Sequence, residues 1–180
     1  MRDNCIRYEK EGSLRDVLSK AYEETRVDGS STFCLLRVGE GGRLETLTLG
    51  DCGAIVFRKV DGKILPVFRT EVNLHDINYP FQVGYFKGEF VGDLLDDADY
   101  KVFDVKRGDV VVAATDGVFD NLFDYKIANL LPRSRNPAKK VVEAARHISL
   151  SPSGITPWSE LSGEVGGKPD DITAVVLRIR

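Results

Sequence analysis

The pattern of apolar and polar positions predicts an alternation of short strands and helices that ends in a strand. Residues 110–114 read Val-Val-Val-Ala-Ala, a nearly continuous apolar run that is typical of a strand buried on both faces. Residues 172–179 form a second strongly apolar strand at the end of the chain. Alternating positions and glycine-containing turns predict four earlier strands, and their short connections favour an antiparallel meander. The expected ranges of these four strands are 32–38, 44–49, 54–59 and 63–68.

Apolar residues at helical spacing predict three helices. The first begins at a capping box formed by Ser13 and Asp16. The last begins at Asn136-Pro137, a cap residue followed by a proline suited to the first helical turn. The expected helices are 13–26, about 120–131, and the one that begins at Asn136.

The remaining segments carry weaker patterns. A strand at 100–105 is expected to pair with the strand at 109–114 through a turn at Lys106-Arg107-Gly108. Residues 71–100 are expected to form a loop packed on the sheet, and residues 149–168 a long loop rich in glycine, serine and proline. We see no linker that would divide the chain, so we expect a single domain over residues 1–180.

Composition narrows the classes of function. The chain has 180 residues and a formal net charge of −3, which gives no electrostatic reason to expect a nucleic-acid partner. No run approaches the ~18 apolar residues that membrane insertion needs. The three cysteines are odd in number and lack a CxxC spacing, which favours a reducing, intracellular compartment.

Two predicted strands carry aspartates at their ends. Asp116 follows the strand at 110–114, and Asp170 and Asp171 precede the closing strand. If these strands are antiparallel neighbours, the two acidic ends lie side by side, and a divalent cation held by carboxylate oxygens would relieve their repulsion. Such a cation lowers the pKa of bound water, so hydrolysis is the natural chemistry. The alternative is that Asp116 only shapes the turn or caps the next helix.

Five ordered motifs resemble those of type 2C metal-dependent serine/threonine protein phosphatases, the PPM family. His75-Asp76-Ile77-Asn78 is similar to the branch called the T-cell-activation or mitochondrial type. The other motifs are GSST at 29–32, LGDCGA at 49–54, GDVVVAATDGVFDNL at 108–122 and GGKPDDITAVVL at 166–177.

The resemblance implies an α+β fold, an αββα sandwich of two antiparallel sheets flanked by helices. It also implies two Mg²⁺ or Mn²⁺ ions whose bound water attacks a phosphoserine or phosphothreonine protein substrate. Asp116 and Asp170 match metal-binding aspartates, and no catalytic residue beyond the metal ligands is implied. Gly117 lets the turn approach the metal, Asp171 supports the site, and Asp51 matches a motif that we interpret as a structural turn.

The family's early Asp-Gly-x-Gly-Gly motif does not occur in this sequence. We therefore expect a phosphatase-like domain that lacks the N-terminal strands and the first metal motif. Its metal binding is expected to be weak, and a partner chain is one candidate for covering the missing strands. Activity of the isolated chain is in doubt on this basis. Two alternatives stay open: a catalytically inactive binding or regulatory module of the same fold, and an unrelated α+β structural domain. The branch resemblance implies a mitochondrion or another organelle, with the cytoplasm as the alternative location.

Overall fold

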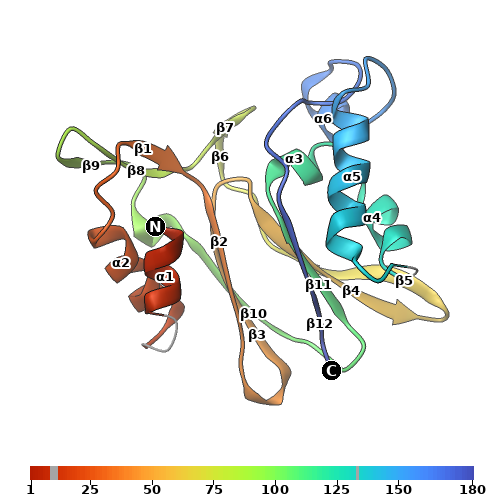
Figure 1. Cartoon of the computed structure of the whole chain (residues 1–180), viewed down its shortest axis with the longest axis horizontal. Helices are drawn as coiled ribbons and strands as arrows, with labels where there is room; N and C mark the ends of the chain where they lie inside the picture. Colours follow the sequence, from red (N-terminus) through yellow and green to blue (C-terminus); the bar gives the residue numbers. More distant parts are fainter. Residues whose placement is uncertain (9–11, 133) are drawn as a thin grey trace. The chain divides into compact units, whose positions relative to one another are not determined.

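The computed structural model describes residues 1–8, 12–132 and 134–180 (Figure 1). The chain is α+β, with antiparallel sheets and helices, as predicted. It divides into two compact units, which we describe separately. The first unit comprises Met1–Gly50 and Glu71–Asp104, and the second unit comprises Asp51–Thr70 and Val105–Arg180.

Among its described residues, the first unit contains two three-stranded sheets, the α-helices α1 and α2, and two short 3₁₀ helices, η1 and η2. One sheet has the order β10-β3-β2, the other has the order β1-β8-β9, and β6 and β7 form a separate two-stranded ribbon. The predicted capping box is confirmed: the Ser13 hydroxyl accepts from Asp16 N at 3.2 Å, and the Asp16 carboxylate accepts from Ser13 N at 2.7 Å. The elements are α1 (Arg2–Arg7), α2 (Leu14–Glu23), β1 (Gly29–Ser31), β2 (Phe33–Val38), η1 (Glu40–Gly42), β3 (Arg43–Leu49), β6 (Leu74–Asp76), β7 (Tyr79–Pro80), β8 (Val83–Phe86), β9 (Glu89–Gly92), η2 (Leu95–Asp97) and β10 (Asp99–Asp104).

Apolar side chains from α2 and from the sheets form the core of the first unit. Leu18 on α2 packs with Leu47 and Leu49 of β3, and Phe33 and Val83 complete the centre of the cluster. The expectation that residues 71–100 form a loop is wrong, because this segment contains the short strands β6 to β9. Their two-to-four-residue lengths are too short to show a sequence period.

The second unit is a four-stranded antiparallel sheet with helices. Its order is β12-β11-β4-β5, so β11 has partners on both edges: Val112 lies opposite Ile55 of β4 and Val176 of β12. The predicted neighbourhood of the strand at 110–114 and the closing strand is confirmed. The elements are β4 (Gly53–Val60), β5 (Lys63–Arg69), β11 (Val110–Ala114), α3 (Asp116–Phe119), α4 (Asp124–Leu130), α5 (Pro137–Ser149), α6 (Pro157–Ser162) and β12 (Ala174–Arg178).

The core of the second unit lies between β11 and its neighbouring helices. Val112 and Ile55 pack with Val118 of α3, Ile127 of α4 and Val141 of α5. Figure 1 shows α5 running along β12, which it contacts. Asn136 caps α5 as predicted, because its side chain accepts from Lys139 N at 3.1 Å.

Two predicted strand connections are wrong. The strand at 100–105 does not pair with β11; it is β10, which pairs with β3. Both edges of β11 are already occupied by β4 and β12, so a third partner has no place. The prediction of one continuous antiparallel meander is also wrong. β3 and β4 belong to different sheets, and residues 50–52 connect them.

Two helix predictions also need correction. The helix expected at 120–131 is shorter: α4 covers Asp124–Leu130, and a separate short helix, α3 (Asp116–Phe119), lies before the expected range. The loop expected at 149–168 contains α6, which begins with Thr156 as its cap and Pro157 in its first turn. The cap and the proline, rather than a long apolar period, determine where α6 begins.

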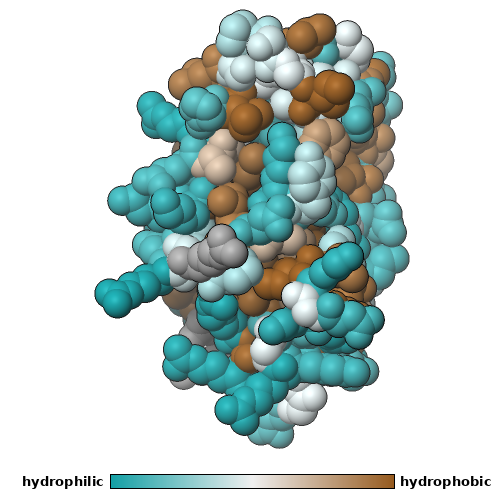
Figure 2. Space-filling view, turned by 90° about the vertical axis from the view of Figure 1, so that its right-hand side faces the viewer, coloured by the Kyte–Doolittle hydropathy of each residue, from teal (hydrophilic) through white to brown (hydrophobic). Residues whose placement is uncertain are grey.

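The surface mixes polar and apolar side chains. Figure 2 shows hydrophobic side chains in separate groups between hydrophilic ones on the side of the molecule that it presents. Exposed apolar residues of the second unit include Leu65, Tyr125 and Leu161. Across the described ranges, with gaps at 9–11 and 133, no helix has the length and apolar character that a bilayer-spanning segment requires.

Candidate functional site

The acidic ends of β11 and β12 meet at one edge of the sheet in the second unit. Asp116 is the first residue of α3, and Asp170 and Asp171 lie just before β12. The ladder between the strands extends past Ala114, because Thr115 N donates to Thr173 O at 3.1 Å and the Thr115 hydroxyl donates to Asp171 O at 3.0 Å. The backbone therefore brings the predicted site residues together.

The side chains of Asp116 and Asp170 converge on one ammonium group. Lys168 Nζ lies 2.7 Å from Asp116 Oδ2, 2.8 Å from Asp120 Oδ2 and 3.3 Å from Asp170 Oδ2. The Lys168 side chain is only 13% exposed, so this is not a solvated surface contact. We call these three aspartates and Lys168 the carboxylate cluster.

The two predicted supporting residues lie directly behind the carboxylate cluster. Gly117 N donates to Asp116 Oδ1 at 2.8 Å, and Asp171 N donates to Asp170 Oδ1 at 2.7 Å, so each backbone amide orients a neighbouring carboxylate. A Cβ at Gly117 would lie 2.5 Å from Asp171 O, which no side chain tolerates without a shift of the backbone. Glycine is required here because α3 and the segment before β12 approach so closely.

Asn121 fixes the backbone of the lysine. Its side-chain Nδ2 donates to Gly117 O and to Lys168 O, each at 2.9 Å, and its Oδ1 accepts from Lys168 N at 2.9 Å. Asn121 is fully buried, so its amide group has no competing contact with solvent. The segment that carries Lys168 is thereby tied to the α3 turn that carries Asp116.

Sequence reasoning missed Asp120, Asn121 and Lys168. Asp120 was detectable, because it lies four residues after Asp116 in a helical turn and so shares one face with it. Lys168 gave a weaker signal, since its position two residues before Asp170 becomes meaningful only when the closing segment is placed against α3. Asn121 gave no signal, because its three bonds go to backbone groups.

Asp51, which we interpreted as a turn residue, is electrostatically part of this region. Burial, reinforced by the negative charge of Asp116, raises the pKa of Asp51 to about 6. The Lys168 ammonium acts in the opposite direction but does not cancel these two effects. Asp51 therefore lies close enough to sense the charges of the carboxylate cluster.

Burial and charge act differently on the members of the cluster. Burial raises the pKa of Asp120, and the Lys168 ammonium offsets only part of this rise. Burial also acts to raise the pKa of Asp170, but the Asp171 N–H and the ammonium outweigh it and hold that pKa below its usual range. For Lys168, burial favours the neutral amine, but hydrogen bonds to Asp116 and Asp120 raise its pKa, so it stays protonated.

The arrangement does not fit a resident divalent cation as it stands. Aspartate oxygens are the ligands that Mg²⁺ and Mn²⁺ prefer. Within residues 1–8, 12–132 and 134–180, however, no group of three or more His, Cys, Asp or Glu side chains is arranged to hold a metal ion. The point where the carboxylates converge is taken by the Lys168 ammonium.

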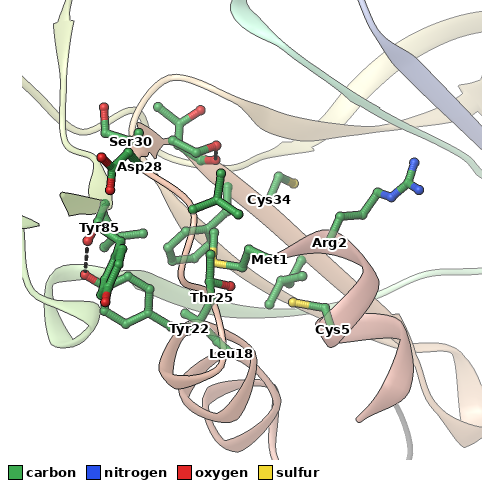
Figure 3. Close-up of a pocket in the computed structure, with 18 of the residues that line it drawn as sticks. Met1, Arg2, Cys5, Leu18, Tyr22, Thr25, Asp28, Ser30, Cys34 and Tyr85 are labelled. Atoms are coloured by element: carbon green, nitrogen blue, oxygen red, sulfur yellow. Dashed lines mark hydrogen bonds between the residues drawn. The ribbon is translucent and has the colours of Figure 1, made fainter. Parts of the chain in front are cut away.

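A separate cavity of about 560 Å³ lies in the first unit (Figure 3). Its wall includes Met1, Cys5, Leu18 and Tyr22, and the Tyr22 hydroxyl donates to the carbonyl oxygen of Gly84 at 2.8 Å. Burial raises the pKa of the Cys5 thiol, which disfavours the nucleophilic thiolate. All three cysteines are among the described residues and none forms a disulfide, so the carboxylate cluster remains the better candidate site.

Curated relatives match almost the whole chain. It is 34% identical over 200 residues to the protein phosphatase PTC7 homolog of Xenopus laevis, which covers 96% of this chain and 66% of that protein. It is 33% identical over 188 residues to the probable protein phosphatase 2C 80 of Arabidopsis thaliana, covering 96% of this chain and 44% of that protein. The chain thus spans less than two thirds of the length of these relatives. No family model matches it.

Solved structures share the fold. The photosystem II phosphatase PBCP superposes with a TM-score of 0.88 and 26% identity, covering 99% of this chain and 77% of that one. The catalytic domain of the serine/threonine phosphatase PstP, solved with two manganese ions, superposes with a TM-score of 0.59 and 16% identity, covering 96% and 76%. Motifs, sequence relatives and fold agree, and the chain belongs to the type 2C (PPM) family of protein phosphatases.

Proposed function

We propose that this chain catalyses hydrolysis of phosphoserine and phosphothreonine in protein substrates. The observation that carries the proposal is the match to protein phosphatases along 96% of the chain. The geometry supports it, because Asp116 and Asp170, which match the family's metal-binding aspartates, lie around a single point.

The charge of the carboxylate cluster indicates what the reaction needs. Three carboxylates surround one ammonium, so the cluster keeps a formal charge of −2. A phosphomonoester is itself an anion at neutral pH and is repelled by such a site. Added positive charge is therefore required before a phosphate group binds here, which supports a dependence on Mg²⁺ or Mn²⁺ within the proposal.

Asp116 and Asp170 are the proposed metal-binding residues, with Gly117 and Asp171 in support. Because the ammonium fills the cluster, a divalent cation binds there only if Lys168 Nζ moves away.

The proposal also includes a mitochondrial or other organellar location, which is supported by the branch resemblance of His75-Asp76-Ile77-Asn78.

The proposal is tested by phosphate release from a phosphothreonine peptide, with Mn²⁺, with Mg²⁺ and with a chelator. Turnover is expected with the metals and not with the chelator. Asp116→Asn is expected to reduce it by ~100-fold or more, because a charged group at the reacting centre is lost. Asp61→Asn is the matched control: it removes the same charge from an exposed hairpin turn with φ 48°, a conformation that asparagine tolerates.

Two results would contradict the proposal. The first is the absence of phosphate release with both metals, which would favour the inactive binding or regulatory module. The second is equal activity of the Asp116→Asn variant and the unaltered chain, which would place the chemistry elsewhere.

A further inference from the structure

Lys168 is held at the carboxylate cluster from two sides. Its Nζ contacts three carboxylates within 3.3 Å, and it lies 5.0 Å from the centroid of the Trp158 ring. Both the charge of the carboxylates and the face of the aromatic ring favour a cation at this position. An ordinary surface lysine has neither this burial nor this number of partners.

The backbone of Lys168 is equally constrained. Asn121 bonds both its N–H and its C=O. The preceding Gly167 packs against the end of α5 so closely that a Cβ would lie 2.0 Å from Ile148 O. The backbone from which the Lys168 side chain extends is therefore fixed by hydrogen bonds and close packing, independently of the attraction between the ammonium and the carboxylates.

We propose that the Lys168 ammonium is a built-in counter-cation of the carboxylate cluster and that it excludes a divalent metal ion from the cluster until it is displaced. The inference rests on the proposed use of a divalent metal, but not on turnover. On this view the metal affinity of the chain is limited by its own lysine, which is why the carboxylate cluster does not fit a resident metal.

Size and charge make the two cations mutually exclusive. A Mg²⁺ ion needs oxygen ligands at about 2.0–2.1 Å in near-octahedral order. The ammonium already lies 2.7 Å and 2.8 Å from two of the same oxygen atoms, so both cations would share one small space. Their mutual repulsion at such separation is strong in a partly buried site.

Trp158 provides a spectroscopic reporter of this exchange. It is the only tryptophan in the chain, so its emission reports one location. Its indole ring faces the ammonium, and its backbone N–H donates to Asp120 O at 2.9 Å. Displacement of Lys168 Nζ should therefore alter the emission of Trp158 during a Mg²⁺ titration.

The experiment compares metal binding by the unaltered chain with that of three variants, without any substrate. Binding of Mg²⁺ and of Mn²⁺ is measured by calorimetry in every protein, and tryptophan emission follows the Mg²⁺ titration of the unaltered chain and of Lys139→Met, which keep the Lys168 ammonium beside Trp158. Lys168→Met is expected to bind both metals about tenfold or more tighter, because the competing charge is gone. Lys168→Arg keeps the charge and is expected to bind no tighter than the unaltered chain. Lys139→Met removes an exposed charge on α5 and is expected to leave affinity unchanged.

Thermal unfolding supplies a second measurement. Without metal, Lys168→Met is expected to melt below the unaltered chain, because three carboxylates repel one another without their counter-cation. Saturating Mg²⁺ should raise its melting temperature more than it raises that of the unaltered chain. If the methionine variant does not fold, Lys168→Gln, which keeps a polar end, is measured in its place.

Three outcomes would overturn the inference. Equal metal affinity of Lys168→Met and the unaltered chain would show that the ammonium does not compete. Weaker binding by the variant would make Lys168 a support for the metal. If neither Lys168→Met nor the unaltered chain bound Mg²⁺ or Mn²⁺, there would be no metal binding for the ammonium to oppose. None of these outcomes depends on phosphate release, so failure here is distinguishable from failure of the proposed phosphatase activity.

Discussion

The two ends of β11 hold charged groups in opposite ways. Before the strand, Asp109 forms a two-pronged pair with Arg58 of β4: Arg58 Nη2 lies 2.7 Å from Oδ2 and Nε lies 2.9 Å from Oδ1. Lys106 N also donates to Asp109 Oδ2 at 2.8 Å. One carboxylate and one guanidinium are thus matched in charge, in geometry and in hydrogen bonds.

After the strand, three carboxylates share one ammonium. The Lys168 donor contacts Asp116, Asp120 and Asp170, and negative charge remains in excess. At the first end, the Arg58 guanidinium neutralises the Asp109 carboxylate. The pKa of Asp109 therefore stays below its usual range, although burial acts to raise it. At the other end, burial raises the pKa of Asp120 despite its hydrogen bond to Lys168.

The difference separates a structural ion pair from a candidate functional site on the same strand. A matched pair has no charge left over with which to bind a further ion. A cluster with unbalanced charge at the end of a rigid strand destabilises the fold. Such destabilising groups are most often found where proteins bind ligands or catalyse reactions. Charge balance, more than the number of acidic residues, distinguishes the two ends of β11.

The largest effect on stability is expected at the matched end. Asp109→Asn leaves the Arg58 guanidinium without its carboxylate at a position where the Asp109 side chain is only 2% exposed. Loss of one partner of a buried pair costs ~3–5 kcal/mol of the free energy of unfolding. Urea unfolding in a chelator measures it as a lower midpoint.

A second ion pair in the same unit provides the control. Arg69 Nη1 and Asp124 Oδ1 are 2.6 Å apart, but both side chains are about one-third exposed. Asp124→Asn is therefore expected to cost ~0.2–1 kcal/mol, as exposed pairs do. Equal losses for the two variants would show that burial does not distinguish the pairs.

The sequence predicts the parts of this site that depend on local chemistry. The apolar run at 110–114 identified a doubly buried strand, and the closing strand at 172–179 proved to be its neighbour, so Asp116 and Asp170 were placed together. The Ser13 and Asn136 caps were predictable for the same reason, because a cap needs only residues within one helical turn.

The remaining features depend on contacts between distant segments. The turn at Lys106-Arg107-Gly108 exists, since Asp109 N donates to Lys106 O, yet it does not join a hairpin. The partners of β11 are β4 and β12, and the local pattern did not predict the pairing with β4, which is distant in sequence. Lys168 was missed for the same reason, because its carboxylate partners on α3 are about fifty residues away in sequence.

A smaller loss of stability is expected when the backbone of the lysine is released. Asn121→Ala removes three hydrogen bonds and leaves Lys168 N–H, Lys168 C=O and Gly117 C=O without the side chain that bonds them. Buried unpaired groups cost ~1–3 kcal/mol, which urea unfolding measures. The tryptophan emission should also change, because the ammonium faces Trp158.

The matched control for this variant is Asn136→Ala. It removes one capping bond, to Lys139 N, at the start of α5 and is expected to cost about 1 kcal/mol. Its tryptophan emission should stay that of the unaltered chain. A change of emission in both variants, or in neither, would contradict the role of Asn121 in placing Lys168.

The smallest effect is expected from Asp51, and it is confined to a pH window. Its pKa is raised from 3.8 to about 6, first by burial and then by the charge of Asp116. Between these pH values the folded state keeps a proton that the unfolded state has released, so the Asp51 contribution to stability falls as pH rises through the window. Asp51→Asn removes this titration, and partial exposure to solvent limits its size.

Thermal unfolding of the Asp51→Asn variant and of the unaltered chain, in a chelator, tests this at pH 4 and pH 7, about two units below and about one unit above the folded pKa of Asp51. The variant should gain melting temperature relative to the unaltered chain as pH rises, because only the unaltered chain must then hold the Asp51 charge beside Asp116. An offset that is the same at both pH values would mean that Asp51 does not share the excess negative charge at this end of β11. Asp109→Asn provides the contrast: the folded pKa of Asp109 is lowered from 3.8, so its stabilising contribution is lost only at still lower pH, and the offset of this variant should differ little between pH 4 and pH 7.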